Sequence, residues 1–175
     1  MDLAALIYYR EAFLDGQWWL PLTAQLVHFN LAHALANLTG SVLLCSLFRP
    51  WLRWQEQALA MAGGMSGVAW VLVWDADCAY YAGASGALHG WAVGGALLMV
   101  MRHFRTSRVA VWIAFALLAG LTIKLLLALG LKTNPAVWGF AVYYPAHVAG
   151  ALGGLLAALA YLGASPRSDK HRQKG

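Results

Sequence analysis

The chain has 175 residues, of which 61% are hydrophobic and 11% are charged. A soluble globular domain usually carries about 25% charged residues, so this composition argues against a soluble protein and favours a membrane protein. The net charge of +5 does not indicate a nucleic-acid partner, because the basic residues lie between apolar runs and in the C-terminal tail, where membrane topology accounts for them.

Residues 1–18 precede the first long apolar run and are predicted to be a lead-in on the outer face. The apolar stretch 3–9 within it is too short to cross a membrane, since a spanning helix needs about 20 residues. No basic segment precedes this stretch, as a signal peptide would require. We interpret it as the remnant of a truncated first helix, and expect a natural version of the chain to carry about 15 further apolar residues before Met1.

Five apolar runs follow, each bounded by charged or turn-forming residues and close to the length of a membrane-spanning helix. They cover residues 19–48, 58–74, 85–101, 109–130 and 145–162. The sequence therefore predicts an all-α polytopic membrane protein, in which residues 19–162 form one membrane domain and residues 163–175 form a basic tail.

Basic residues mark one side of the predicted bundle. They lie between the first and second runs, between the third and fourth, and after the fifth: Arg49, Arg53, Arg102, Arg105, Arg108, Arg167, Lys170, Arg172 and Lys174. Cytoplasmic segments are rich in Lys and Arg, so these segments and the C-terminus are predicted to be cytoplasmic. Lys124, in the outer half of the fourth run, is expected to extend toward the lipid headgroups.

The two cysteines fall on opposite sides of the predicted membrane. Cys45 lies toward the cytoplasmic end of the first run and Cys78 in an outer loop. The bilayer separates them by far more than the roughly 7 Å that a disulfide allows between Cα atoms. Both are expected to be free thiols, and Cys78 is expected to react with impermeant reagents from outside.

Polar side chains are costly inside a bilayer and are functional candidates there. In this chain they gather in the first, third and fifth runs, as His28, His33 and Asn37, then Ser85 and His89, and finally His147. These three runs all enter the membrane from outside, and the polar residues occupy the entering half of each. The residues are therefore predicted to share one depth near the outer surface.

Glycines surround Ser85 and follow His147 at helical spacing. They are Gly83, Gly86, Gly90, Gly150 and Gly154. Small residues four apart let membrane helices approach closely, so the third and fifth runs are predicted to pack together and to bring Ser85 within hydrogen-bond reach of His147. A serine paired with a histidine in this way is a nucleophile with its general base.

His33 and Asn37 are four residues apart and project from one helix face. Together with the backbone amide of Ser85 at a helix N-terminus, they are candidate donors to an oxyanion. His28 lies about 140° around the helix and is predicted to be structural, with support of the dyad as its other role. His89 shares a face with Ser85, where it would either compete as base or pack beneath His147, and we favour packing.

The seven acidic residues are predicted to lie in loops or at the termini, away from the serine and histidine. We therefore infer a dyad of Ser85 and His147 without a carboxylate. No metal site and no cofactor are implied.

These residues resemble the rhomboid family of intramembrane serine proteases. The family pattern combines Gly-x-Ser-Gly in one helix, a histidine followed by small residues in a later helix, and His-x4-His-x3-Asn earlier, and all three parts are present here in that order. The resemblance runs from about residue 19 to 162. It implies that Ser85 and His147 cleave membrane-anchored protein substrates and that the Ser85 amide, His33 and Asn37 form the oxyanion hole. No obligate oligomer is implied.

Within the family, the short chain, the lead-in to Trp18 and Trp19, and the Leu88-His89-Gly90 sequence are similar to the bacterial rhombosortase branch. That resemblance implies C-terminal anchors containing Gly-Gly as substrates, and an inner membrane location with the active site toward the periplasm. Two positions depart from the family pattern, since most rhomboids have Tyr in place of His89 and many have Arg in place of Leu20. A rhomboid core also has six helices, one more than the five runs found here.

Two other classes of function fit parts of this pattern. His28, His33, His89 and His147 would form an intramembrane metal site in a transporter, although no carboxylate or thiolate is predicted at their depth. Alternatively, the chain is an inactive rhomboid-like protein that holds transmembrane clients. Loss of Ser85 or His147 would signal that second class, and both residues are present.

Overall fold

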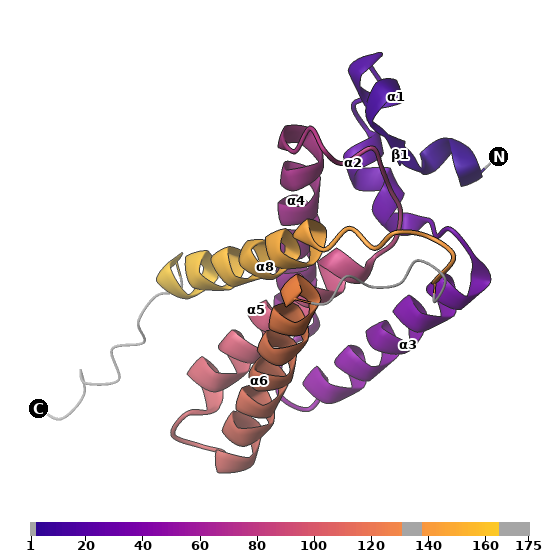
Figure 1. Cartoon of the computed structure of the whole chain (residues 1–175). Helices are drawn as coiled ribbons and strands as arrows, with labels where there is room; N and C mark the ends of the chain where they lie inside the picture. The colour runs from indigo at the N-terminus through magenta and orange to yellow at the C-terminus, as the bar shows by residue number, and fades with distance from the viewer. Residues whose placement is uncertain (1–2, 131–137, 165–175) are drawn as a thin grey trace, which may run out of the picture.

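The computed structural model describes residues 3–130 and 138–164. In chain order the elements are the 3-10 helix η1 (Leu3–Leu6), β1 (Tyr8–Tyr9), α1 (Arg10–Leu14), α2 (Leu20–Thr23), the 3-10 helix η2 (Ala24–Leu26), α3 (Leu31–Phe48), α4 (Trp54–Trp74), β2 (Tyr80–Tyr81), α5 (Ser85–His103), α6 (Arg108–Gly130) and α8 (Pro145–Ala164). Figure 1 shows the long helices as one bundle, with the N-terminal elements at one end of it.

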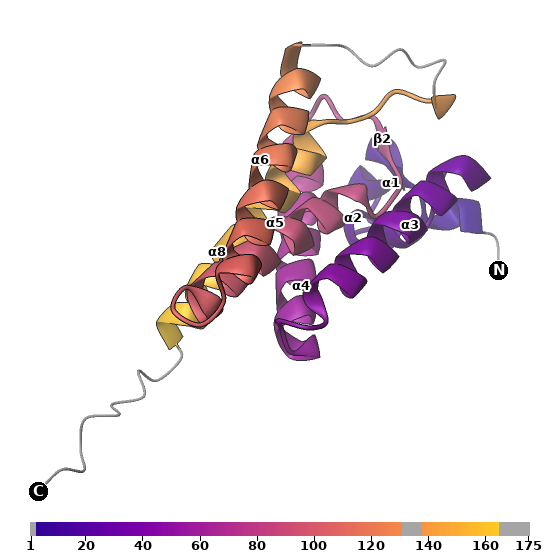
Figure 2. The ribbon, with the colours of Figure 1, turned by 90° about the horizontal axis from the view of Figure 1, so that it is seen from below.

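The fold is an all-α membrane bundle, as predicted. Among the described residues, α3, α4, α6 and α8 are long and apolar enough to cross a membrane. The fifth predicted span is α5, which is about 28 Å long at 1.5 Å per residue but carries glycine, serine and histidine in its first half. It tolerates them because it packs against α3, α4, α6 and α8, so protein rather than lipid surrounds it (Figure 2).

The prediction of one continuous helix over residues 19–48 is wrong. The chain forms the short helices α2 and η2, becomes extended at Val27, and starts α3 at Leu31. Asn30 is the N-cap of α3, and its side-chain Oδ1 accepts a hydrogen bond of 2.8 Å from the backbone N–H of His33. An asparagine that caps a helix in this way ends the preceding segment. His28 therefore lies in the connection before α3 and not within a spanning helix.

Close contact between α4, α5 and α8 forms the centre of the bundle. A Cβ added at Gly86, Gly90 or Gly94 of α5 would lie 2.8, 2.6 or 2.5 Å from the carbonyl oxygen of Ala146, Gly150 or Gly154 of α8, respectively. Such distances leave no room for a side chain, so the two helices touch through their backbones over two turns. The glycines of α5 and α8 that were predicted to pack together thus face each other.

Helix α4 completes this packing with glycines that the sequence analysis did not single out. A Cβ on Gly64 would lie 2.6 Å from the carbonyl oxygen of Ala87 in α5, and a Cβ on Gly63 would lie 2.6 Å from that of Gly153 in α8. The three helices therefore form one tightly joined unit, which fixes the positions of the residues that α5 and α8 carry.

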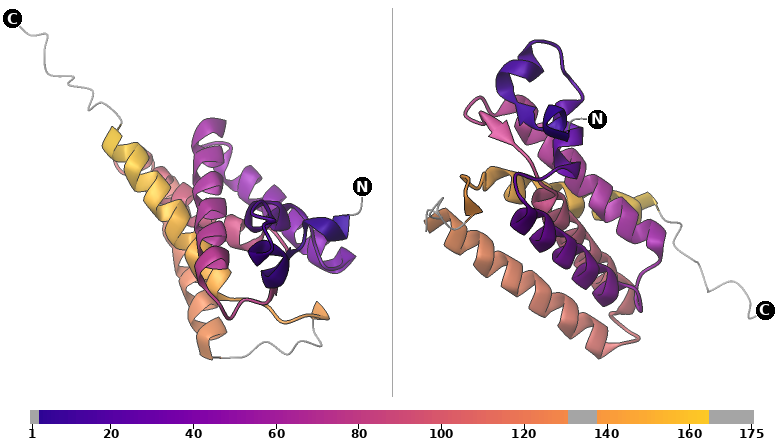
Figure 3. Two further views of the ribbon diagram at one scale, coloured as in Figure 1. Left: turned by 90° about the horizontal axis from the view of Figure 1, so that it is seen from above. Right: turned by 90° about the vertical axis from the view of Figure 1, so that its right-hand side faces the viewer.

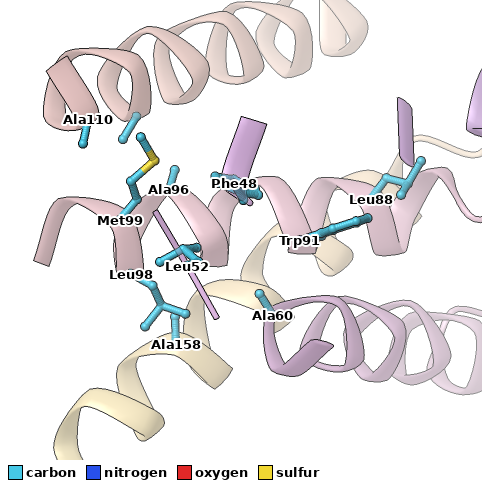
Figure 4. Packing of buried hydrophobic residues seen from close by; sticks show 11 residues of the cluster. Phe48, Leu52, Ala60, Leu88, Trp91, Ala96, Leu98, Met99, Ala110 and Ala158 are labelled. Atoms are coloured by element: carbon cyan, nitrogen blue, oxygen red, sulfur yellow. The ribbon is translucent and has the colours of Figure 1, made fainter. Parts of the chain in front are cut away.

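Helix α3 is attached to this unit mainly at its C-terminal end. Phe48 is fully buried, and its ring fills the space beside Gly95 of α5, where a Cβ would lie 2.6 Å from the ring. Figure 4 shows Phe48 among the buried side chains of α5, including Trp91 and Met99. Residues along α3 from His33 to Leu47 line a cavity next to α5.

The lead-in packs on the end of the bundle where α4 ends. Tyr8 and Tyr9 pair with Tyr81 and Tyr80 in a two-stranded antiparallel sheet, and the hydroxyl of Tyr8 donates a hydrogen bond of 2.6 Å to the carbonyl of Leu72 at the end of α4. Figure 3 shows these N-terminal elements against the start of α3 and the end of α4. In the described part of the chain before α2, the elements are η1, β1 and the short helix α1, and none is long enough to span a membrane.

The opposite end of the bundle is basic. Arg53 before α4 and Arg102 in α5 both donate hydrogen bonds to the hydroxyl of Tyr161 in α8, at 2.7 and 3.4 Å. Arg102 also forms an ion pair with Glu56, which is fully buried in the first turn of α4 and not in a loop as predicted. Because α3, α5 and α8 all end at this side, their N-termini meet at the other end.

Candidate active site

Ser85 and His147 form a direct hydrogen bond. Ser85 is the first residue of α5 and His147 the third residue of α8, and the Ser85 Oγ atom lies 2.9 Å from Nε2 of His147. The contacts of Gly86 and Gly150 between the two helices hold their backbones close enough for this bond. An imidazole at this distance can take the proton of a serine hydroxyl, which activates the oxygen as a nucleophile.

Gly83 makes the turn into α5. Its φ of +115° lies in a region that L residues with side chains rarely adopt, and its backbone N–H donates a hydrogen bond of 2.9 Å to the carbonyl of Ala24. A Cβ on Gly83 would lie 2.6 Å from Nε2 of His33 and 3.5 Å from Nδ2 of Asn37. The side chains of His33 and Asn37 in α3 therefore point at the turn that carries Ser85.

His33 and Asn37 are both buried, with exposed fractions of 7% and 6%. One amide proton of Asn37 is donated to the carbonyl of His33, one turn earlier, at 3.2 Å. An amide has two such protons, so the second is available to a group in the cavity beside Ser85. Both residues line this cavity together with Ser85 and His147.

His28 lies beside His33 and not beside the dyad. Its ring meets that of His33 edge to face, with centroids 5.0 Å apart, while the ring of Phe140 packs on His33 at 4.8 Å. Burial lowers the pKa of His28 below its ordinary value. His28 thus lies in the cluster around His33 and does not contact Ser85 or His147.

His89 packs against His147. The two rings are stacked, with centroids 4.4 Å apart and an angle of 13° between their planes. Nδ1 of His89 lies 2.7 Å from the carbonyl oxygen of Ser85. This arrangement corresponds to the packing role that the sequence analysis favoured over a competing base, because the ring of His89 faces the ring of His147 and its nitrogens are directed elsewhere.

Lys124 does not extend toward the headgroups, so this prediction is wrong. Its Nζ atom lies 3.2 Å from Nε2 of His89, which places the ammonium group beside the dyad. Helix α6 is apolar on all sides, and its sequence gives no indication of which face contacts α5. Its occurrence as a single lysine within an otherwise apolar spanning segment was the signal that could have identified Lys124 as a candidate site residue.

No carboxylate contacts His147 in the described part of the chain. Nδ1 of His147 is buried, and within residues 3–130 and 138–164 it has no hydrogen-bond partner. Over the same residues, no cluster of three or more His, Cys, Asp or Glu side chains is arranged to hold a metal ion. The four histidines of the proposed metal site form two separate pairs, His28 with His33 and His89 with His147.

The site opens into a cavity of about 580 Å³. Its walls come from α3, α5, α6 and residues 138–144. Leu43, Leu44, Leu117 and Leu121 give it apolar sides, and Ser85 lies at its polar end. A cavity with this lining can accept an apolar segment while presenting one of its peptide bonds to polar groups.

Two residues of the connection between α4 and α5 are more buried than a loop position suggests. Cys78 is a free thiol as predicted, but its side chain is 2% exposed and burial raises its pKa to about 11. Tyr81, which was not singled out, lies with its hydroxyl 3.2 Å from a Cβ added at Gly86, and burial raises the pKa of Tyr81. A neutral phenol therefore adjoins the first turn of α5.

Comparison with known families gives one match. The sequence model of the Rhomboid domain family matches residues 15–164, which include every helix from α2 to α8. Comparisons with curated proteins and with solved structures give no significant match. With most of the chain matched, and with Ser85, His147, His33 and Asn37 gathered around one cavity, the chain belongs to the rhomboid family.

Proposed function

We propose that this rhomboid protein is an intramembrane serine endopeptidase with Ser85 as nucleophile and His147 as general base. The observation that carries the proposal is the distance of 2.9 Å between Ser85 Oγ and His147 Nε2 at the polar end of an apolar cavity. A serine whose role is only to let two helices pack closely needs no imidazole beside its hydroxyl. A serine that acts as a nucleophile needs one as its general base.

The reaction follows from the donors around Ser85. His147 Nε2 takes the Ser85 proton as Oγ attacks the carbonyl carbon of the scissile bond, and the carbonyl oxygen becomes an oxyanion. Backbone N–H groups in the first turn of α5, the second amide proton of Asn37 and His33 are the donors proposed for it. His147 then gives its proton to the leaving amine, and water hydrolyses the acyl-enzyme through the same base.

The proposed substrate is a membrane-anchored protein whose spanning segment enters the cavity from the side. The apolar walls from α3 and α6 suit such a segment, and the polar end requires it to unwind, because the carbonyls of a helix are occupied by its own hydrogen bonds. Weak helix formers such as glycine favour unwinding. Gly-Gly-containing C-terminal anchors, the substrates implied by the resemblance to rhombosortases, have this property.

We further propose that the site faces the periplasm across a bacterial inner membrane. The basic end of the bundle, with Arg53 and Arg102, lies opposite the N-termini of α5 and α8. Cytoplasmic ends of membrane proteins are rich in such residues. In this arrangement residues 1–18 are an outer lead-in, residues 19–162 are the membrane domain, and residues 163–175 are a cytoplasmic tail.

The test uses a fluorophosphonate probe, which reacts covalently with activated serines, on the full chain purified in detergent. The wild type is expected to be labelled, and Ser85→Ala and His147→Ala are expected not to be. Ser66→Ala is the matched control, because Ser66 is bonded to its own helix at the carbonyl of Ala62, 2.9 Å away. Labelling that survives in Ser85→Ala, or folded wild type that never reacts, would overturn the proposal.

An inactive protein that holds clients is the second candidate, since the same cavity would hold a spanning segment without cutting it. Co-expression with a membrane-anchored reporter separates the two functions. Cleavage that requires Ser85 supports the protease, and capture of an uncut reporter by a wild type that resists the probe supports the client-binding protein. A second reporter with Leu-Leu in place of Gly-Gly tests the substrate class, because it is expected to be cut more slowly.

A further inference from the structure

Lys124 places a positive charge in the membrane-spanning part of the bundle. A charged side chain within a bilayer is costly and is usually paired with another polar group of the protein. Among the described residues, its hydrogen-bond partner is His89, with Nζ 3.2 Å from Nε2 of the imidazole. This contact joins α6 to α5 directly beneath the dyad.

The hydrogen bonds of His89 define which of its nitrogens carries the proton. A carbonyl oxygen only accepts, so the 2.7 Å contact between Nδ1 of His89 and the Ser85 carbonyl requires an N–H at Nδ1. Nε2 of a neutral imidazole is then an acceptor. An ammonium group only donates, and the 3.2 Å contact with Lys124 supplies that donor. The two partners therefore hold one tautomer and one ring plane of His89.

The ring plane of His89 matters because His147 has no carboxylate to orient it. Nδ1 of His147 has no hydrogen-bond partner in residues 3–130 and 138–164. The His147 ring is held instead by the bond to Ser85, the parallel stack with His89 and an edge-to-face contact with Tyr144, with centroids 5.6 Å apart. A rotation of the His89 ring would remove the flat surface on which His147 rests. Without this surface the His147 ring could turn, and its Nε2 atom would point away from the Ser85 hydroxyl.

We propose that Lys124 is a positioning residue for the reaction: through its hydrogen bond to Nε2 of His89 it holds that ring parallel to His147, and so keeps His147 aligned on Ser85. This inference rests on the proposed protease function. In a Ser-His-Asp triad, a buried carboxylate orients the histidine by a hydrogen bond. Here Lys124 and His89 perform the same task, because they fix the ring that stacks on His147.

The experiment measures the reaction of the fluorophosphonate probe at several concentrations, which separates the maximal rate of acylation from the apparent affinity. Lys124→Met removes the donor and keeps an unbranched side chain, and it is expected to lower the maximal rate about 10- to 100-fold, as small misalignments of reacting groups do, with unchanged affinity. Lys124→Arg keeps N–H donors at that position and is expected to restore most of the rate. Ile123→Met, on the exposed neighbouring face of α6, is the matched control and is expected to be unaffected.

A double-mutant cycle identifies the contact responsible. His89→Phe keeps an aromatic ring under His147 but has no nitrogen to accept a hydrogen bond, so Lys124→Met is expected to have no further effect in that background. If Lys124 acted through general stability or directly on the substrate, its loss would be just as harmful in His89→Phe. That result would overturn the positioning role.

A second readout does not depend on activity. In protein labelled with ¹⁵N-histidine, the Nε2 resonance of His89 is identified by its loss in His89→Phe, and it is expected to shift in Lys124→Met and to stay in place in Ile123→Met. A wild type that never reacts with the probe overturns the proposed function and this inference together. A reactive wild type, with either an unmoved resonance or an unchanged acylation rate in Lys124→Met, overturns the role of Lys124 alone.

Discussion

The rings of His89 and His147 lie parallel, with an angle of 13° between their planes and 4.4 Å between their centroids. The stack supports one face of the His147 ring. The stacking itself requires a flat ring, and the hydrogen bonds of the His89 nitrogens fix the plane of that ring.

This stack predicts how substitutions of His89 differ. His89→Tyr restores the residue that most rhomboids carry in this position, keeps a ring beneath His147 and is expected to retain much of the activity. His89→Ala leaves His147 unsupported and is expected to lower the rate about 10- to 100-fold. Both rates are measured with the fluorophosphonate probe, after thermal unfolding has shown that each variant is folded. Equal activity of the two variants would show that the stack does not align the base.

Asn37 provides a second prediction, on the oxyanion. Asn37→Ala removes a cavity-lining amide that uses one of its two protons within α3. A lost oxyanion donor typically costs about 100- to 1000-fold in rate, and loss of one among several proposed donors is expected to cost about 10- to 1000-fold here. The measurement is the initial rate of reporter cleavage. Unchanged cleavage by Asn37→Ala would remove it from the oxyanion hole.

The backbone contact between α4, α5 and α8 predicts a strong effect of one methyl group. In Gly90→Ala the added Cβ would lie 2.6 Å from the carbonyl oxygen of Gly150 and 2.9 Å from the backbone nitrogen of Gly64. Neither backbone can rotate away, so the helices must separate, at a cost of about 1–3 kcal/mol, and Ser85 would move from His147. Unfolding in detergent and probe labelling measure the two effects.

Gly120→Ala is the matched control for Gly90→Ala. Nothing lies within 4 Å of a Cβ at Gly120 in α6, and alanine is the better helix former by about 1 kcal/mol. This variant is expected to be as stable as the wild type or more so, with full labelling. Equal stability of Gly90→Ala and Gly120→Ala would contradict the close packing.

Cys78 is predicted to resist thiol reagents despite its position in the connection between α4 and α5. Its pKa is raised to about 11, first by burial and then by the charge of Asp75. Because the thiolate is the reactive form, labelling with an impermeant maleimide at pH 7–8 is expected to be slow in the native protein and rapid after unfolding in SDS. A cysteine introduced at the exposed Asp77, in a Cys78→Ala background, serves as the accessible control. Rapid native labelling of Cys78 would contradict its burial.

A contact between the residues after α4 and those before α8 gives a prediction on how stability depends on pH. The hydroxyl of Tyr143 donates a hydrogen bond to the carboxylate of Asp75, and this bond is the main cause of the lowered pKa of Asp75. A carboxyl group whose pKa is lower in the folded state stabilises the folded state at pH values above 3.8, the ordinary pKa of the group. This stabilisation is lost as the pH falls through the folded-state pKa. Tyr143→Phe is therefore expected to lower the unfolding temperature near pH 7.

The loss in Tyr143→Phe is expected to shrink as the pH falls below 3.8, where Asp75 takes up a proton in the unfolded state, and to vanish below the lower pKa of the folded state. Asp77→Asn is the control, because it removes the neighbouring exposed carboxylate and leaves the bond to Tyr143 in place. Unfolding curves between pH 3 and 7, in a detergent insensitive to pH, measure the effect. A loss that stays constant over that range would show that the hydrogen bond to the ionised carboxylate is not its source.

The sequence by itself determined the class of fold and the end of the bundle at which the candidate site residues gather. Runs of apolar residues require helices in a bilayer, since no other structure of a single short segment satisfies its backbone there. Helices that alternate in direction bring the starts of the first, third and fifth runs to the same side, so the relation of Ser85 to His147 was predictable from order alone. The glycines of α5 and α8 predicted their contact because no side chain keeps them apart.

Only the tertiary structure decided features that depend on how each element is rotated or interrupted. The side chain of Asn30 ends one segment and caps the next, a local competition that an apolar run does not reveal. Helix α6 is apolar on every face, so hydropathy leaves its rotation undetermined and could not direct Lys124 to His89. The burial of Cys78 depends on the pairing of β1 with β2, which brings together residues about 70 positions apart and has no signal in either segment alone.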